Sequence, residues 1–349
     1  MKRLNLLAHM ALISFCLMGC SATNNLTMGV TEPATVVLSP DVRTIGIINR
    51  SLPSEANQKA DQIDKILSIE GLQLDQQGSE ASLQALKNAL LDQGIVEEVK
   101  ILNPNHQINK GLGIWPASLS WDIIDNLCAQ HEVDAIFSLA FYDTDTQIDY
   151  RATSMLLPNN LGIKVAVPAH ELTLHTKIKN GWRVYDAKQG VIADELQCND
   201  QVVSVGKGIN PVKAYEAIAG RKEAVLQYST NMGSDYVRRL QPLYKRISRE
   251  YYVRGSHNFT VARRRAQTGD WQGAAALWEQ EINNTNPKIA GRAYYNMAIS
   301  NEINGDLEKA MDWASKAYSD YNNKLALRYL NALKYRSTQV AALERQISR

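Results

Sequence analysis

Histidine and glutamate side chains come close together at His170-Glu171 and His175. A zinc protease carries two histidines four residues apart on a helix, with a glutamate between them as general base. Here the histidines are five residues apart, and the alternating pattern around them predicts a strand. An odd spacing on a strand places the two side chains on opposite faces. We therefore expect ordinary exposed or hydrogen-bonded histidines and no metal site.

The other motifs that could carry catalysis are weak. Gly206-Lys207-Gly208 lacks the preceding spacing of a phosphate-binding loop and predicts a turn. Gly111, Gly113 and Trp115 belong to a loop that could line a pocket, but two glycines alone do not define a site. The sequence has no Gly-x-Ser-x-Gly nucleophile elbow and no paired-cysteine metal motif. It therefore predicts no enzyme activity and no cofactor.

Cys20 is the residue whose position indicates a covalent modification. Two positive charges and a mostly apolar run over residues 6–18 precede it, which is the layout of a secretory signal. The run is shorter than the about 20 apolar residues that a membrane-spanning helix needs. The pattern Leu17-x-Gly19-Cys20 resembles the lipobox of bacterial lipoproteins. The resemblance implies cleavage after Gly19 and acyl chains such as palmitate on Cys20; the alternative is an ordinary signal with an incidental cysteine.

A lipidated Cys20 predicts a location in the bacterial cell envelope. No acidic cluster follows it, so we expect an outer-membrane anchor with the protein facing the periplasm. Without Lys2 and Arg3 the net charge of +2 falls to about 0, which gives no reason to expect nucleic acid as a partner. Cys128 and Cys198 could form a disulfide in this oxidising compartment or remain two separate thiols.

The N-terminal half combines strand-like and helix-like segments after a flexible tether at residues 20–35, which follows the signal peptide at 1–19. The predicted strands are 35–39, 44–49, 96–102 and 135–142, and the predicted helices are 56–69, 79–93 and 121–131. Beyond residue 170 the pattern is antiparallel, and Asn180-Gly181 is a strong signal for a hairpin turn. Another strand follows from Val191. We therefore expect a mixed α/β sheet domain over residues 36–208.

Residues 209–255 are predicted to form connecting helices. The second of them is expected over residues 235–252, where Pro242 would kink or split it. This part of the chain is basic: between Asp235 and Arg265, nine positive residues stand against two negative ones, an excess of 9 − 2 = 7. The excess has two interpretations. It forms a surface for anionic headgroups, glycans or an acidic partner, or it is an ordinary solvated surface offset by acidic groups elsewhere.

The C-terminal part contains an internal repeat with an offset of 305 − 269 = 36 residues. The recurring residues are Gly269, Asp270, Trp271, Ala274 and Trp278, and then Gly305, Asp306, Leu307, Ala310 and Ala314. Glycine permits the tight turn between two helices, aspartate caps the second helix, and alanine lets helices approach closely. The pattern resembles the tetratricopeptide repeat, whose period is about 34 residues. It predicts an all-α helical domain over residues 256–349.

A longer resemblance covers most of the mature chain. It comprises the lipobox, Trp182-Arg-Val-Tyr-Asp, the segment 246–255 and the Gly269-Asp-Trp repeat. In this order they resemble an uncharacterised family of tetratricopeptide-containing lipoproteins known mostly from Bacteroidetes. The resemblance implies an α+β protein, a sheet domain followed by helical repeats, and no particular activity.

The sequence thus predicts a non-enzymatic envelope lipoprotein that acts as a scaffold or adaptor for another envelope protein. Tyr294, Tyr295 and Asn301 on the first helices of the repeats are the expected partner contacts, although such positions also serve helix packing. One alternative is a ligand-binding, glycan-binding or hydrolytic sheet domain that the repeats support. Another is a structural component of a larger lipoprotein assembly.

Overall fold

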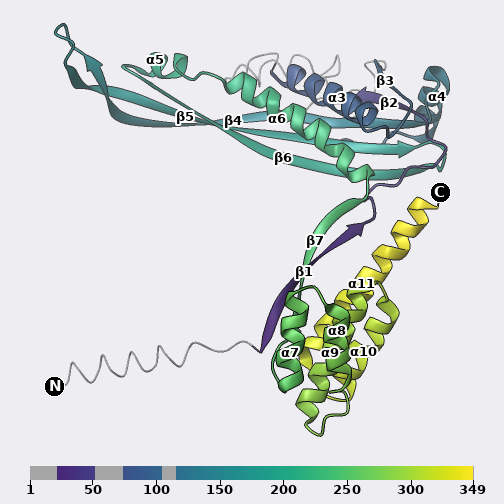
Figure 1. The fold of residues 1–349 in the computed structure, drawn as a ribbon. Helices are drawn as coiled ribbons and strands as arrows, with labels where there is room; N and C mark the ends of the chain where they lie inside the picture. Colours follow the sequence, from purple (N-terminus) through teal and green to yellow (C-terminus); the bar gives the residue numbers. More distant parts are fainter. Residues whose placement is uncertain (1–21, 52–73, 104–114, 349) are drawn as a thin grey trace, which may run out of the picture. The chain divides into compact units, whose positions relative to one another are not determined.

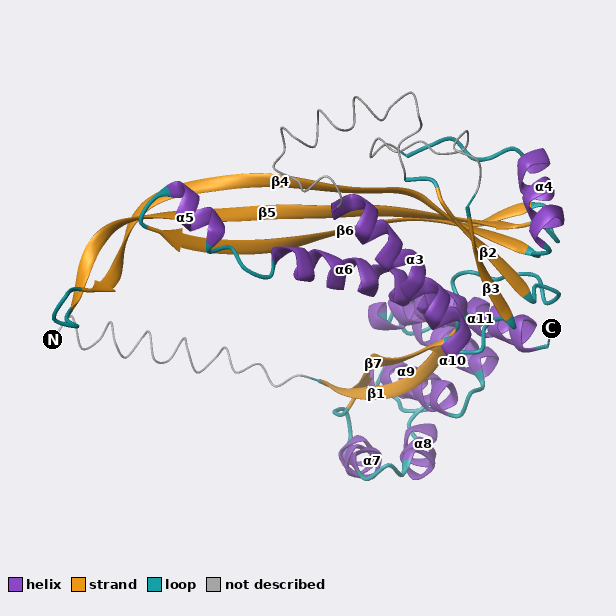
Figure 2. Ribbon diagram, turned by 90° about the horizontal axis from the view of Figure 1, so that it is seen from above, coloured by secondary structure: helices purple, strands orange, loops and turns teal. Residues whose placement is uncertain are grey.

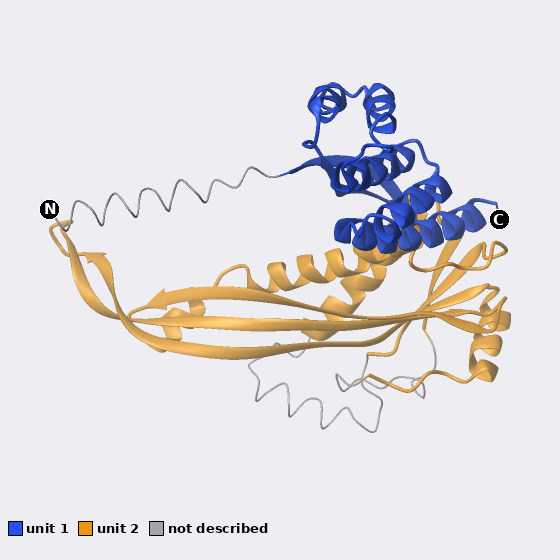
Figure 3. Ribbon diagram, turned by 90° about the horizontal axis from the view of Figure 1, so that it is seen from below, with its two compact units in different colours: residues 1–33, 242–349 blue, residues 34–241 orange. Residues whose placement is uncertain are grey.

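The chain divides into two compact units (Figure 3). The sheet unit is formed by residues 34–241, and the helical unit by residues 1–33 and 242–349. The mixed α+β class is confirmed, with strands dominating the N-terminal region and helices the C-terminal one. The computed structural model describes residues 22–51, 74–103 and 115–348.

Some predicted features lie outside the described residues. These are the signal peptide with Cys20, the helix expected at 56–69, and Gly111 and Gly113 of the loop before Trp115. Among the helices that the structure does describe, none has the length and apolar character needed to cross a bilayer.

The sheet unit contains a five-stranded sheet in the order β3-β2-β4-β5-β6 (Figure 1). Its strands are β2 (Thr44–Asn49), β3 (Glu98–Leu102), β4 (Ala135–Pro158), β5 (Lys164–Asp186) and β6 (Val191–Gly208). β2 runs parallel to both β3 and β4, whereas β5 runs antiparallel to both β4 and β6. The strand expected at 35–39 does not form, because the Val36 amide donates to Arg239 and the Ser39 amide to Asp186, on two different segments.

Helices cover both faces of this sheet near β2. The helices of the unit are α3 (Leu74–Asp92), α4 (Trp121–His131), α5 (Pro211–Glu216) and α6 (Arg221–Asp235), followed by the 3-10 helix η2 (Tyr236–Leu240). Leu86 of α3 packs with Phe137 and Trp182 on one face, where Val225 of α6 also lies. On the other face, Ile124 of α4 lies in a second cluster of buried side chains. The sheet is therefore buried on both sides at this end, which explains its continuous apolar strands.

The outer ends of β4 and β5 extend beyond these helices, and the views in Figures 1 and 2 agree on this. The structure thus makes β4 24 residues long, where the sequence predicted a strand that ends at Tyr142. From Asp145 to Arg151 most side chains of β4 are exposed and polar. An apolar pattern alone detects only the part of a strand that is buried.

The hairpin turn expected at Asn180-Gly181 is wrong, because both residues lie inside β5. A Cβ atom on Gly181 would lie 2.3 Å from the Trp115 ring and 2.4 Å from the Phe141 ring. The glycine therefore permits a close approach of two aromatic rings beside the irregularity in the β4–β5 register. The chain turns between these strands at residues 159–163 instead.

Within residues 22–33 and 242–348, the helical unit contains a two-stranded antiparallel ribbon and five helices. They are β1 (Thr23–Glu32), β7 (Leu243–Tyr252), α7 (His257–Gln267), α8 (Trp271–Glu279), α9 (Pro287–Ile303), α10 (Leu307–Ser319) and α11 (Lys324–Ile347). Tyr251 of β7 is buried together with Phe259, Trp278 and Tyr329 from the helices. The ribbon is thus part of the same core as the helices.

The ribbon corrects two predictions. Residues 20–35 are not only a tether, because Thr23–Glu32 form β1. The helix expected over 235–252 ends at Leu240, and the strand β7 follows it. The chain therefore leaves the helical unit after β1 and returns to it at Pro242, so the boundaries expected at 35 and 255 do not match the two units. Local patterns missed β1 because its partner strand lies more than 200 residues away in the sequence.

The repeat residues have equivalent roles in the helix pairs α7–α8 and α9–α10. Gly269 and Gly305 adopt φ angles of 86° and 84°, which an L-residue with a side chain rarely adopts. Asp270 caps α8 by accepting from the Gly273 amide at 2.8 Å, and Asp306 caps α10 by accepting from the Lys309 amide at 3.0 Å. The alanines of the repeat, together with Trp278, are fully buried: Ala274, Ala310 and Ala314.

Candidate functional site

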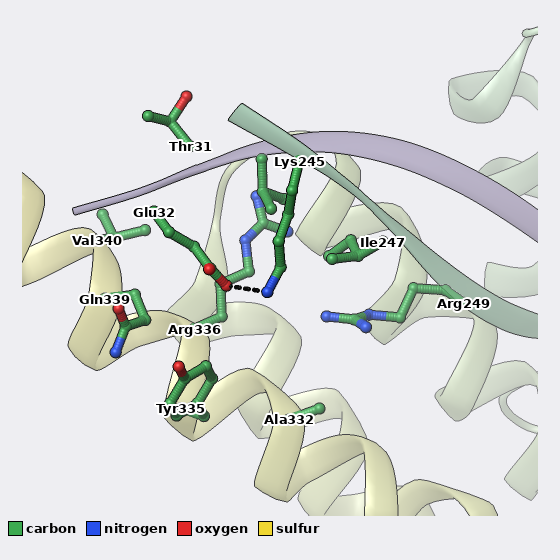
Figure 4. A pocket seen from close by; sticks show the side chains of 11 residues that line it. Thr31, Glu32, Lys245, Ile247, Arg249, Ala332, Tyr335, Arg336, Gln339 and Val340 are labelled. Atoms are coloured by element: carbon green, nitrogen blue, oxygen red, sulfur yellow. Dashed lines mark ion pairs between the residues drawn. The ribbon is translucent and has the colours of Figure 1, made fainter. Parts of the chain in front are cut away.

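A cavity of about 140 Å³ opens in the helical unit between the ribbon and α11 (Figure 4). Three alternate residues of β7 and the last three residues of β1 line it. α11 contributes residues three and four positions apart, which lie on one side of a helix. Its apolar lining comes from Val30, Ile247, Ala332, Tyr335 and Val340. We call this cavity the groove.

A fully buried carboxylate lies beside the groove and ties three elements together. Glu302 of α9 accepts two hydrogen bonds from Arg249 of β7, at 2.8 and 2.9 Å, and others from Tyr329 at 2.7 Å and Arg336 at 2.6 Å. Burial opposes its ionisation, but the hydrogen bonds and charges of Arg249 and the other donors outweigh it, so the pKa of Glu302 is lowered. Glu302 therefore stays ionised and holds both arginines in place.

Two cations at the groove retain hydrogen-bonding capacity. Lys245 forms an ion pair with Glu32 at 2.5 Å, and the side chain of Lys245 is 44% exposed. Arg336 uses Nη1 for Glu302, and its Nε and Nη2 donate to no acceptor among the described residues. Counting Arg249 as well, three cations face two carboxylates, an excess of 3 − 2 = 1 positive charge. A carboxylate could thus be bound at the rim by charge-assisted hydrogen bonds.

The size of the groove limits what can enter it. Its volume is close to the about 150 Å³ of a protein cavity that binds benzene. One aromatic or aliphatic side chain fits, and a large cofactor does not. The groove can therefore bind an apolar group that lies next to an acidic one.

The predicted partner contacts on α9 are placed differently. Tyr295 is 2% exposed and donates to the Glu250 carbonyl at 3.0 Å, so its side chain is not accessible to a partner. Tyr294 is half-buried against Trp313 and a second tyrosine ring. Asn301 donates to the Met297 carbonyl of its own helix. These side chains mainly stabilise the helix packing.

Sequence reasoning missed Glu302 and its arginine partners. The signal was present, because Glu302 follows Tyr295, Ala298 and Ile299 at helical spacing on the apolar side of α9. A lone acidic residue on such a face is almost never fully buried unless it is paired. The positions of Arg249 and Arg336, on other elements, could not be read from this pattern.

The basic segment predicted between Asp235 and Arg265 is divided between the two units. Arg238 and Arg239 belong to the sheet unit, whereas the later cations belong to the helical unit. Many of these cations are paired with carboxylates: Arg238 with Asp235, Arg239 with Asp194, Lys245 with Glu32, Arg249 with Glu302 and Arg265 with Asp270. This pairing favours the interpretation that acidic groups elsewhere offset the charge.

His170 and His175 of the sheet unit lie on β5 and take part in cross-strand contacts. His170 shares a hydrogen bond of 2.6 Å with Tyr150, and His175 lies 3.2 Å from Asp149 and 2.9 Å from Gln201. The structure describes no group of three or more His, Cys, Asp or Glu side chains that could hold a metal ion.

The turn expected at Gly206-Lys207-Gly208 is also wrong, because these residues end β6. A Cβ atom on Gly206 would lie 2.1 Å from the Ala214 carbonyl oxygen, and one on Gly208 would lie 2.3 Å from the Ala214 nitrogen. The glycines let α5 pack directly on the strand.

Cys128 and Cys198 are separate free thiols. Burial, together with the nearby Asp125 and Asp134, raises the pKa of Cys128 to about 11. Burial likewise raises the pKa of Cys198. Neither thiol has the lowered pKa of a reactive cysteine.

Comparison with solved structures finds distant similarities. The PelC dodecamer from Paraburkholderia phytofirmans matches at 10% identity with a TM-score of 0.24, over 62% of this chain and 98% of that chain. A neuraminyllactose-binding hemagglutinin homologue from Helicobacter pylori matches at 8% identity with a TM-score of 0.21, over 58% of this chain and 92% of that chain. At these TM-scores the similarities support no inference about the fold or function of this chain. No curated protein matches the chain in sequence.

Two protein families match the chain along its length. Residues 260–335, which span α8 to α10, match a domain of unknown function, DUF6340. Residues 42–252, which include the whole sheet of the sheet unit, match another domain of unknown function, DUF8603. Because this second match covers more than half of the sequence, the chain belongs to the DUF8603 family.

Proposed function

We propose that the protein is a lipid-anchored adaptor of the bacterial cell envelope that binds a segment of another envelope protein in the groove. The Leu17-x-Gly19-Cys20 pattern supports an anchor at Cys20, in the outer membrane and facing the periplasm. The resemblance to tetratricopeptide-containing lipoproteins of Bacteroidetes supports the class. The helix pairs α7–α8 and α9–α10, with equivalent glycine turns and aspartate caps, support a tetratricopeptide-like unit.

One observation carries this proposal: the groove is apolar, and cationic side chains at its rim have N–H groups that donate to no described acceptor. A partner segment inserts one aromatic or aliphatic side chain between Ile247 and Ala332. A neighbouring carboxylate on the partner pairs with Arg336 or Lys245. Apolar insertion supplies affinity, and the charge pair selects the register of the bound segment.

The groove explains why α11 is longer than the other helices of this unit. α11 comprises 24 residues, and those that line the groove lie between Ala332 and Val340, in its middle. A closing helix that only capped the repeats would need to cover α10 alone. The additional turns of α11 form one wall of a binding site.

In-cell photocrosslinking tests the proposal. A photoreactive phenylalanine analogue replaces Tyr335, which is 60% exposed at the groove. We expect one dominant envelope protein to be crosslinked. Ala332→Phe fills the groove and should abolish the crosslink, whereas Asn331→Phe, on an exposed position of the same helix, should leave it intact.

Two results would count against an adaptor. Crosslinks that are unchanged by Ala332→Phe would mean that the groove is not where the partner binds. An absence of any crosslinked protein, with normal accumulation of the variant, would favour the alternative function below.

The alternative is a ligand-binding or glycan-binding sheet unit. One observation favours it: a hollow of about 230 Å³ lies beside Arg221, Lys222 and Tyr215, at the junction of α5 and α6. Arg221 donates to Thr146 and Thr176 on the sheet, which positions it at the edge of this hollow. An anionic glycan whose binding is lost in Lys222→Ala would support this function.

A further inference from the structure

The turn between β4 and β5 presents apolar side chains to solvent on both faces of the β4–β5 hairpin. We call residues 152–170 the tip; Figure 1 shows the turn at the far end of the strands from α3 and α4. Leu161 is 81% exposed, Leu156 63% and Ile163 59%. Because successive strand residues point to opposite faces, Leu156 and Leu157 face opposite ways. A partner with a flat surface would cover only one of these faces, whereas an apolar medium covers both.

Most backbone N–H groups of the turn donate to acceptors within the turn itself. Asn159 donates to the Ile163 carbonyl at 2.9 Å, and Gly162 donates to the Asn159 carbonyl at 2.9 Å. The side-chain oxygen of Asn159 accepts from the Leu161 amide at 2.9 Å and from the Ile163 amide at 3.0 Å. Pro158 has no N–H group to satisfy. Most amide groups of the turn can thus leave water at little cost, which a loop in contact with lipid requires.

Charge changes along the same strands. Asp143, Asp145 and Asp149 lie on β4 before the tip, whereas the tip itself contains no aspartate or glutamate. The one formally charged residue of the tip is Lys164, and directly below the tip Arg151 is ion-paired with Glu171 at 2.9 Å. An apolar apex with a cation beside it, and with the acidic groups set back along the strands, is complementary to a membrane surface that contains anionic lipids.

We propose that the tip inserts into the headgroup region of a lipid bilayer and gives the protein a membrane contact in addition to the lipid expected on Cys20. Leu156, Leu161 and Ile163 enter the boundary between headgroups and acyl chains. Lys164 remains at headgroup level and pairs with phosphate groups. This inference is independent of the groove and of any protein partner.

The depth of insertion follows from the unpaired strand edges of the β4–β5 hairpin. In the described sheet, β6 pairs with β5 only from His170 onward, so the tip is two-stranded and its outer backbone groups need water or headgroups. Only the turn and the last residues of each strand can therefore enter the apolar region. This corresponds to the about 5–10 Å of interfacial insertion that is typical of surface-bound amphipathic segments.

Fluorescence quenching on the full chain tests the proposal. A fluorescent coumarin amino acid replaces Leu161 in one variant and Val203 in a control. Val203 is 53% exposed on β6 and lies outside the tip. Each variant is reconstituted into vesicles of phosphatidylethanolamine and phosphatidylglycerol. We expect acyl-chain doxyl lipids to quench the probe at 161 strongly and the probe at 203 weakly, and aqueous iodide to do the reverse.

Further variants make the outcome decisive. Leu156→Asn with Ile163→Asn should abolish doxyl quenching at 161, and Val205→Asn, at an exposed valine of β6, should not. Iodide quenching at 161 equal to that at 203, with no doxyl quenching at either, would overturn the proposal. So would an emission shift at 161 that needs no vesicles and grows with protein concentration, because a second copy would then cover the tip.

Discussion

Arg249 of β7 and Glu302 of α9 form a two-point ion pair, in which Nε lies 2.8 Å from Oε2 and Nη2 lies 2.9 Å from Oε1. The Arg249 side chain is 15% exposed and the Glu302 side chain 0%. The pair joins the ribbon to the helices in the interior of the helical unit. Removing one partner would leave the other charge buried without compensation.

Glu302→Gln should therefore lower the free energy of unfolding of the helical unit by about 3–5 kcal/mol. Glutamine keeps the size of the side chain but leaves Arg249 and Arg336 without a counter-charge. Urea unfolding measures the change. Glu344→Gln, at an exposed position of α11, is the control and should change stability by less than about 0.5 kcal/mol. Equal effects of the two substitutions would contradict the role of the buried pair.

The same carboxylate predicts a pH dependence. Because the pKa of Glu302 is lowered in the native state, its contribution is complete above the ordinary carboxyl value of about 4.3. This contribution is lost as the pH falls through the lowered native pKa. The stability difference between the natural chain and Glu302→Gln should thus narrow as urea unfolding is repeated from neutral pH towards about pH 3. Parallel stability curves would show that Glu302 does not titrate as a paired group.

Gly269→Ala and Gly305→Ala should each destabilise the helical unit by about 1–2 kcal/mol. A Cβ atom at either position meets no atom within 4 Å, so the cost is that of the left-handed backbone and not of a steric clash. Asparagine should be tolerated better than alanine at both positions. Gly255→Ala, where a Cβ would lie 3.4 Å from Phe259, is the control and should be nearly neutral in thermal unfolding.

Gly181→Ala should destabilise the sheet unit by about 1–3 kcal/mol through overpacking. The new methyl group would meet the rings of Trp115 and Phe141 at 2.3 and 2.4 Å. Trp115→Leu should restore part of the loss in the double variant, as a double-mutant cycle by urea unfolding would show. Full additivity of the two substitutions would mean that the ring does not contact this position.

Cys128 should react slowly with iodoacetamide in the native protein at pH 8, because its pKa of about 11 keeps the thiolate fraction small. The rate should rise with pH until that value is approached. Mass spectrometry of the alkylated chain measures it, with the urea-unfolded chain as the fast reference. A peptide that links Cys128 to Cys198 would contradict the separate thiols.

The sequence by itself determined the elements whose signals are local. The helix at 121–131 begins and ends where its apolar periodicity predicted. The two Gly-Asp turns of the repeat also occur where expected, with the aspartates as caps. Helix periodicity, caps and left-handed glycines depend on residues within one or two turns of the chain. A single sequence therefore contains all the information they need.

Only the tertiary structure decided the features that depend on distant residues. β1 becomes a strand because β7 lies beside it, and Gly181 belongs to a strand because two aromatic rings pack against it. Glu302 can be buried because Arg249 and Arg336 come from two other elements. In each case the stabilising partner is remote along the chain. The free energy of the contact with that partner exceeds the local conformational preference that the sequence pattern indicates.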